Sequence, residues 1–174
     1  MPRILQPAKN LESLEICREA HEALDISELA TYPRLAALSL STINWEEGTI
    51  SQGDNFIRFP VEDFIVRHRM TLKKLGLYNC RIWVCVEVEE STETPFHFWA
   101  DVYDRLAEVL IELVKLVVVL KDDGYCIEYD VPPDHEDVHR RLRSEWAERD
   151  TLALERFKAV VGNRKMDAGS SSQR

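Results

Sequence analysis

The stretch R-I-W-V-C-V-E-V-E at residues 81–89 decides the fold class expected from this sequence. Ile82, Val84, Val86 and Val88 fall on one side of an extended chain, while Arg, Trp, Cys and Glu side chains fall on the other. This alternation predicts a β-strand with one buried face and one partly wet face.

Further strands are expected on both sides of this one. Residues 116–120 and 125–131 flank Lys-Asp-Asp-Gly at 121–124, and an Asp-Gly pair supplies the positive φ of a tight turn. The pattern therefore predicts an antiparallel hairpin. Residues 56–59 and 64–66 are short apolar runs separated by Pro60, which predicts two edge strands.

The main helix is predicted between these strands. Thr94 is a typical N-cap and Pro95 suits the first helical position, so a helix is expected from 95 to about 114. Its apolar residues recur at helical spacing, which places Trp99 and Leu106 on the buried face.

Helices are also expected towards both ends of the chain. Apolar spacing predicts an amphipathic helix over 10–23 and allows a short one over 33–40. A last helix is expected to begin after Asp134 and to end at Gly162. The fold class is therefore α+β: a single domain with a small antiparallel sheet packed by a central helix, and with N- and C-terminal helices.

The chain has 174 residues and a mass of 20.2 kDa, which fits one core. We expect an N-terminal helical segment and loop over 1–50, an α+β core over 51–131, and a basic helix with a polar tail over 132–174. No apolar run approaches the length of a membrane span, and the N-terminus lacks a signal-peptide pattern.

The charge is unevenly distributed. The net charge is −9, yet residues 86–137 carry −12 while 51–85 carry +3 and 138–174 carry +4. One basic patch contains Arg67, Arg69, Lys73 and Lys74, and a second lies over 140–143. Either they are solvated faces that pair with nearby acids such as Glu62 and Asp63, or they contact anionic lipid or a nucleocapsid.

Two short motifs suggest function. His135, Glu136 and His139 match H-E-x-x-H, the pattern in which two histidines bind zinc and the glutamate acts as base. The match follows two prolines at an expected helix start, which favours an exposed helix end, so no metal or other cofactor is expected. Tyr32, Pro33 and Leu35 form a Y-P-x-L pattern, which some viral proteins use to bind host membrane-scission machinery; the alternative is an ordinary turn.

The four cysteines lack the spacing of a zinc site or a redox pair and are expected to be reduced and packed. Nucleophile-elbow, phosphate-loop and dinucleotide-binding glycine patterns are absent from the sequence, so the protein is expected not to be an enzyme.

The order of these elements resembles the C-terminal half of rhabdovirus matrix proteins over about residues 51–131. In that family a Gly-Leu-Tyr leads into a long strand, a Trp and an Asp open the next helix, and a hairpin with a glycine turn ends the domain. Residues matching these positions are Gly76, Leu77, Tyr78, Trp99, Asp101 and Gly124. The chain departs from the family in its acidic N-terminus and in the basic helix after the hairpin. Its compact size and acidity suggest a plant-infecting, cytoplasmic member.

The resemblance implies a non-enzymatic structural adaptor for viral assembly and budding. Such a protein self-associates as a homo-oligomer, condenses the nucleoprotein-RNA complex and links it to an anionic membrane surface, with the envelope glycoprotein and host budding factors as further partners. It would lie inside the virion beneath the envelope, in the host cytoplasm and on host endomembranes. The alternatives are a zinc metallohydrolase using the H-E-x-x-H motif and a cellular protein-interaction module.

Overall fold

The computed structural model describes residues 9–17, 26, 29–45, 49–50, 57–86, 98–121, 124–129 and 136–171. Its strands and helices are as follows, in chain order: β1 (Ser13–Cys17), β2 (Ala37–Ser41), β3 (Asn44–Trp45), β4 (Thr49–Ile50), β5 (Ile57–Arg58), α1 (Pro60–Arg67), β6 (Lys74–Tyr78), β7 (Arg81–Val86), α2 (Trp99–Val109), β8 (Lys115–Val119), β9 (Tyr125–Tyr129) and α3 (Glu136–Ser171). The chain is therefore α+β, as the sequence predicts.

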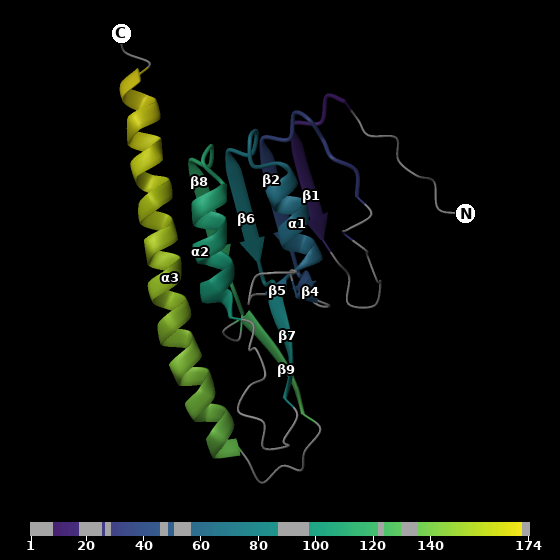
Figure 1. Cartoon of the computed structure of the whole chain (residues 1–174), viewed down its shortest axis with the longest axis vertical. Helices are drawn as coiled ribbons and strands as arrows, with labels where there is room; N and C mark the ends of the chain where they lie inside the picture. Colours follow the sequence, from purple (N-terminus) through teal and green to yellow (C-terminus); the bar gives the residue numbers. More distant parts are fainter. Residues whose placement is uncertain are drawn as a thin grey trace, which may run out of the picture.

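The main sheets are parallel, so the predicted antiparallel sheet is wrong. Four strands pair in the order β1-β2-β6-β8, and three pair in the order β3-β7-β9, all of them parallel. Only the two-residue strands β4 and β5 pair antiparallel among the described residues. Three times, the chain passes from a strand of the first sheet to one of the second (Figure 1).

A row of left-handed residues connects the two sheets. Thr42 has φ 58° between β2 and β3, Asn79 has φ 52° between β6 and β7, and Gly124 has φ 77° immediately before β9. The bends lie next to one another, because the Thr42 N–H donates to the Tyr78 carbonyl at 2.8 Å and the Asn79 N–H donates to the Val119 carbonyl at 2.7 Å.

The segment 116–131, which was predicted to be a hairpin, contains one of these bends instead. Gly124 does take the expected positive φ, but β9 pairs with β7 and β8 pairs with β6. A Cβ on Gly124 would lie 2.6 Å from both Trp99 Nε1 and Leu120 Cδ1. Glycine is therefore required here by backbone angle and by space.

The strands of the first sheet share a leucine pattern that recurs along the chain. Leu72-x-x-Leu75-x-Leu77-x-x-Cys80-x-Ile82 matches the L-x-x-L-x-L-x-x-C-x-L signature of leucine-rich repeats. Partial copies of it begin at Leu11, Leu35 and Leu113, at irregular intervals of 24, 37 and 41 residues. The strand register aligns the copies, since Leu38 lies opposite Leu75, and Leu75 lies opposite Leu116.

Several predicted helices and strands have different structures. The segment over 10–23 contains β1, and β2 begins within the segment over 33–40, because alternation of leucines outweighs the partial helical spacing in both. The run 64–66 lies in α1, where Pro60 occupies the first turn and begins the helix instead of limiting a strand. Helix α3 continues beyond Gly162 to Ser171.

Helices α1 and α2 lie against one face of the first sheet, and α3 packs along α2 (Figure 1). The buried residues between them include the strand leucines and an aromatic group in which Trp45, Trp99 and Tyr103 contact one another in series. Trp99 and Leu106 are both fully buried, which confirms their predicted position. Residues 94–97, including the predicted cap, lie outside the described residues.

The N-terminus of α2 is capped by side chains distant in the sequence. The Asp150 carboxylate on α3 accepts the Ala100 N–H at 2.7 Å and also the Tyr125 hydroxyl, which itself accepts the Trp99 N–H at 3.0 Å. Phe98, at the N-cap position, makes no side-chain cap. Burial is the main cause that raises the pKa of Asp150. The carboxylate therefore binds α2, β9 and α3 together at a site that is largely shielded from water.

Replacing Leu106 with alanine should destabilise the protein by about 2 to 5 kcal/mol, because the side chain is fully buried and its loss leaves a cavity. Denaturant unfolding of both proteins measures the difference. Leu152→Ala on the exposed face of α3 is the control and should change stability little. An unchanged unfolding midpoint in Leu106→Ala would contradict this core assignment.

Candidate recognition surface on the parallel sheet

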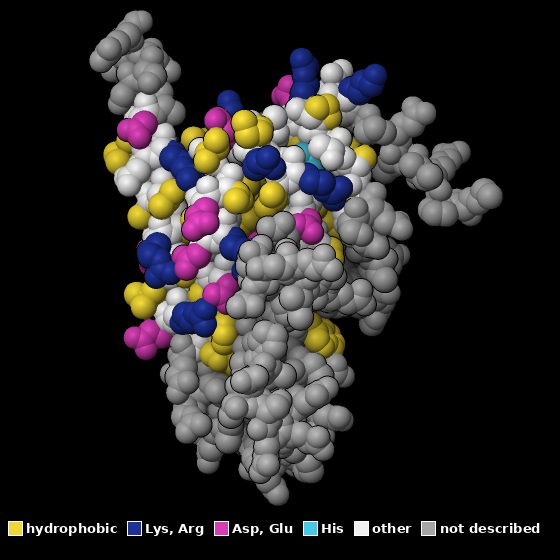
Figure 2. All heavy atoms as spheres, in the orientation of Figure 1, with side chains coloured by type: hydrophobic (Ala, Val, Ile, Leu, Met, Phe, Trp, Pro, Cys, Tyr) yellow, Lys and Arg dark blue, Asp and Glu magenta, His cyan; other side chains and the backbone are white. Residues whose placement is uncertain are grey.

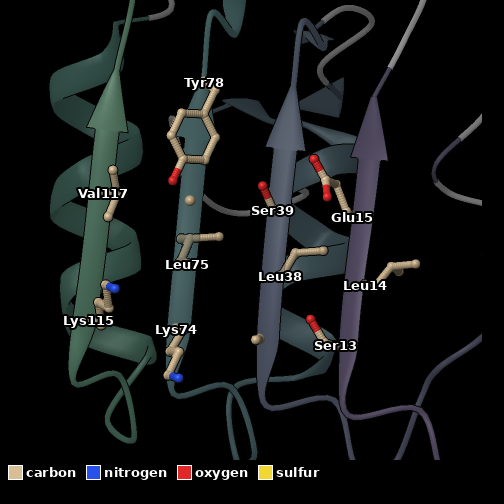
Figure 3. Close-up of a pocket in the computed structure, with 12 residues that line it drawn as sticks. Ser13, Leu14, Glu15, Leu38, Ser39, Lys74, Leu75, Tyr78, Lys115 and Val117 are labelled. Atoms are coloured by element: carbon tan, nitrogen blue, oxygen red, sulfur yellow. The ribbon is translucent and has the colours of Figure 1, made fainter.

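The face of the first sheet opposite the helices is the candidate functional site. The strand register places on it three side chains from each strand, and we call these twelve residues the open face. They are Ser13, Glu15, Cys17, Ala37, Ser39, Ser41, Lys74, Gly76, Tyr78, Lys115, Val117 and Val119. Figure 3 views this face, with the helices behind the strands.

The open face is hollowed along its middle. A shallow depression of about 190 Å³ is lined by residues of all four strands. Its floor is low because the central strands β2 and β6 contribute Ala37, Ser39 and Gly76 there. We call this depression the trough; Glu15 of β1 and Val117 of β8 lie along its sides, and Lys74 and Tyr78 of β6 lie at its two ends.

Tyr78 lies across Gly76 at one end of this trough. A Cβ on Gly76 would approach Tyr78 Cε2 to 2.6 Å, so the ring packs directly over the glycine. Figure 3 shows the ring along β6 with its hydroxyl towards the middle of the face. Tyr78 thus places an apolar ring and a polar hydroxyl in the trough, and Val119, which is 53% exposed, flanks it in register.

Two lysines mark the other end of the trough. Lys74 and Lys115 are register partners on β6 and β8, and both are exposed. Arg69 and Lys73, two members of the predicted basic patch, precede β6 and are exposed at the same edge. Lys and Arg side chains gather along this edge above α1 in Figure 2. The structure thus brings Lys74 of the predicted patch together with Lys115, which the sequence did not indicate.

Arg67 differs from the rest of the predicted patch. Its guanidinium donates to the Leu29 carbonyl at 3.0 Å and lies 5.4 Å from the centre of the Phe64 ring. It therefore holds the 29–35 segment against α1. The suggested pairing of the patch with Glu62 is wrong, because Glu62 is buried and binds Arg105 through two hydrogen bonds of 2.6 and 2.8 Å. The suggested pairing with Asp63 stays a prediction.

The Y-P-x-L pattern is part of the core. Tyr32 is 7% exposed and Leu35 is fully buried, and the Leu35 N–H donates to the Tyr32 carbonyl to close a turn. Pro33 is exposed at this turn. A partner that reads Tyr32 and Leu35 side chains cannot reach them in the folded protein, so the proposed late motif is a structural turn.

His68 holds this turn in place. Its Nε2 accepts the Tyr32 N–H at 2.9 Å, and its Nδ1 lies 2.8 Å from the Phe64 carbonyl. Nδ1 must carry the proton, since a carbonyl only accepts. The ring is therefore neutral. Burial is the main cause that lowers the pKa of His68, with the nearby Arg67 charge acting in the same direction.

The H-E-x-x-H residues lie at the beginning of α3. Glu136 is its first residue and His139 lies one turn later, whereas His135 lies outside the described residues. Among the residues that the structure describes, no group of three potential metal ligands comes together. Zinc binding stays an untested alternative.

A second hollow among the described residues is a groove between α2 and α3. It is lined by charged residues, of which Arg156 pairs with Asp104 at 2.8 Å, and by the exposed Leu152. Arg149, also at this groove, pairs with Asp101 and stacks on Phe98 at 4.3 Å. These two ion pairs link α2 to α3 across the groove.

Comparison with known proteins finds no matching family, no matching curated protein and no matching solved structure. None of the helices in the described ranges has an apolar stretch long enough to cross a bilayer.

Acidification should destabilise the fold through His68. The folded state keeps the imidazole neutral, whereas the unfolded chain protonates near pH 6.5, so the unfolded state binds more protons below that pH. The free energy of unfolding should therefore fall as pH drops from about 6.5 towards the lowered pKa. Denaturant titrations at several pH values measure this slope, and His68→Gln, which cannot titrate, should show a shallower one. Equal slopes in the two proteins would contradict the assignment.

Proposed function

We propose that this protein is a recognition module that binds an extended segment of another protein on the open face. One observation carries the proposal: the four-stranded parallel sheet is covered by helices on one face, while side chains on the other are accessible. Parallel sheets usually have both faces covered. Arrays of leucine-rich repeats are an exception, and repeat arrays of this kind bind partners along an extended surface.

The shape of the trough favours an extended segment. Its floor spans the two central strands, about 5 Å apart, and is bordered by side chains of β1 and β8. A single extended chain fits such a width. The backbones of β2 and β6 are already paired on both sides, so recognition must depend on side chains.

The chemistry of the face is that of a binding surface. It offers serine hydroxyls, the Tyr78 ring and hydroxyl, the exposed Val119, and the charges of Glu15, Lys74 and Lys115. Opposite charges at separate places allow a partner to be bound in one direction.

A viral matrix adaptor is the second candidate. The exposed Arg69, Lys73 and Lys74 at one edge favour it, since such a group attracts anionic lipid or a nucleocapsid. In place of the hairpin on which the resemblance partly rested, a bend carries the chain from β8 in one parallel sheet to β9 in the other. Self-association, nucleocapsid condensation and membrane attachment therefore stay predictions, and we favour the recognition module.

Filling the trough should abolish binding and leave the fold intact. Ser39 lies in the middle of the face between Glu15 and Gly76, so Ser39→Trp places a large side chain over the floor. A phage-displayed library of random dodecapeptides, selected on the full chain, should yield clones that bind the wild type but not this variant. Circular dichroism and thermal melting check that the variant folds.

Leu152→Trp is the matched control, since Leu152 is exposed at the groove between α2 and α3. Clones that lose binding to Leu152→Trp and keep it to Ser39→Trp would move the binding site to that groove. A selection that yields no clone sensitive to Ser39→Trp would refute the proposed function.

A further inference from the structure

We infer that the segment bound on the open face is acidic, with an apolar side chain next to its carboxylates. This inference rests on the proposed function and adds the chemistry of the partner. It starts from the lysine pair at the beginning of β6 and β8.

Lys74 and Lys115 are neighbours of like charge. They are directly opposite in the parallel register, and within the part of the chain that the structure describes no carboxylate pairs with either amine. Figure 3 shows them side by side at the start of their strands. Like charges on adjacent strands repel one another. A carboxylate that binds between the two amines removes this repulsion and adds two attractive contacts.

The rest of the face determines which way the segment lies. Further along β6 and β8 from the lysines, Tyr78 and Val119 present apolar surface, with Val117 between the lysine row and Val119. Glu15 lies across the trough on the exposed edge strand β1. A segment with carboxylates over the lysines therefore places its neighbouring apolar side chain near Tyr78 and keeps further acidic groups away from Glu15.

The overall charge of the protein favours a short segment over a large anionic surface. The net charge is −9, and repulsion from it grows with the number of anionic groups that approach. A membrane or an RNA presents many such groups, whereas a short segment meets mainly the local lysine pair.

The test is a double charge reversal, Lys74→Glu with Lys115→Glu. Lys121→Glu with Lys165→Glu is the matched control, because both residues are exposed lysines outside the open face and the net charge changes equally. The probes are the displayed dodecapeptides selected on the wild-type chain, synthetic copies of the strongest binders, vesicles of phosphatidylserine with phosphatidylcholine, and polyuridine RNA.

Selected peptides should be enriched in Asp or Glu next to an aliphatic or aromatic residue. Their dissociation constants should rise about ten-fold or more in the Lys74 and Lys115 variant and change little in the control, as expected for two exposed charge contacts turned from attraction to repulsion. Binding to the wild type should weaken with added salt.

Three results would overturn the inference. Peptides blocked by Ser39→Trp but lacking acidic residues, or indifferent to the charge reversal, would leave the recognition module standing and remove its acidic partner. Vesicle or RNA binding that depends on Lys74 and Lys115, without peptide binding, would favour the viral matrix adaptor. A selection with no clone sensitive to Ser39→Trp would refute both proposals together.

Discussion

The in-register alignment of leucines across the parallel sheet is the constraint on which the rest of the structure depends. Leu38, Leu75 and Leu116 form one row, and Leu40, Leu77 and Val118 form the next. Because side chains alternate along a strand, a shift of one residue would turn every one of these towards water. The same alternation fixes the opposite face, so the residues of the open face are placed there by the packing of the core beneath them.

Some of the fold follows from local sequence and some does not. Alternation identified the strand now seen as β7, and helical spacing identified α2 with the buried Trp99. The direction in which strands pair is not determined by local sequence. Asp-Gly before residue 125 suits both a tight hairpin turn and a bend after which the chain continues in the same direction. The pairing of β9 with β7 decides between the two. In the N-terminal segment, Leu11, Leu14 and Cys17 fit a helix while Leu14 and Ile16 fit a strand, and only pairing with β2 resolves the choice.

For a similar reason, the candidate surface could be predicted only partly from the sequence. Lys74 could be found by its charge, but its neighbour Lys115 lies far along the chain and is brought beside it by the sheet. The recurring Leu-x-x-Leu-x-Leu spacing was the available signal. Irregular intervals between its copies obscure it, and two of the intervals are longer than those of ordinary leucine-rich repeats. The Y-P-x-L motif shows the opposite error: the sequence matches a binding motif, but the Tyr32 and Leu35 side chains are buried and cannot bind a partner.

Asp150 makes the beginning of α2 depend on a residue that is fifty positions further along the chain. During synthesis, strands β1 to β9 and helix α2 leave the ribosome before α3 is complete, with the Ala100 N–H and the Tyr125 hydroxyl still lacking this acceptor. Domains generally form as their chain emerges. Here the final closure of the core must wait for α3, and until then the surface of α2 that α3 later covers is exposed to water.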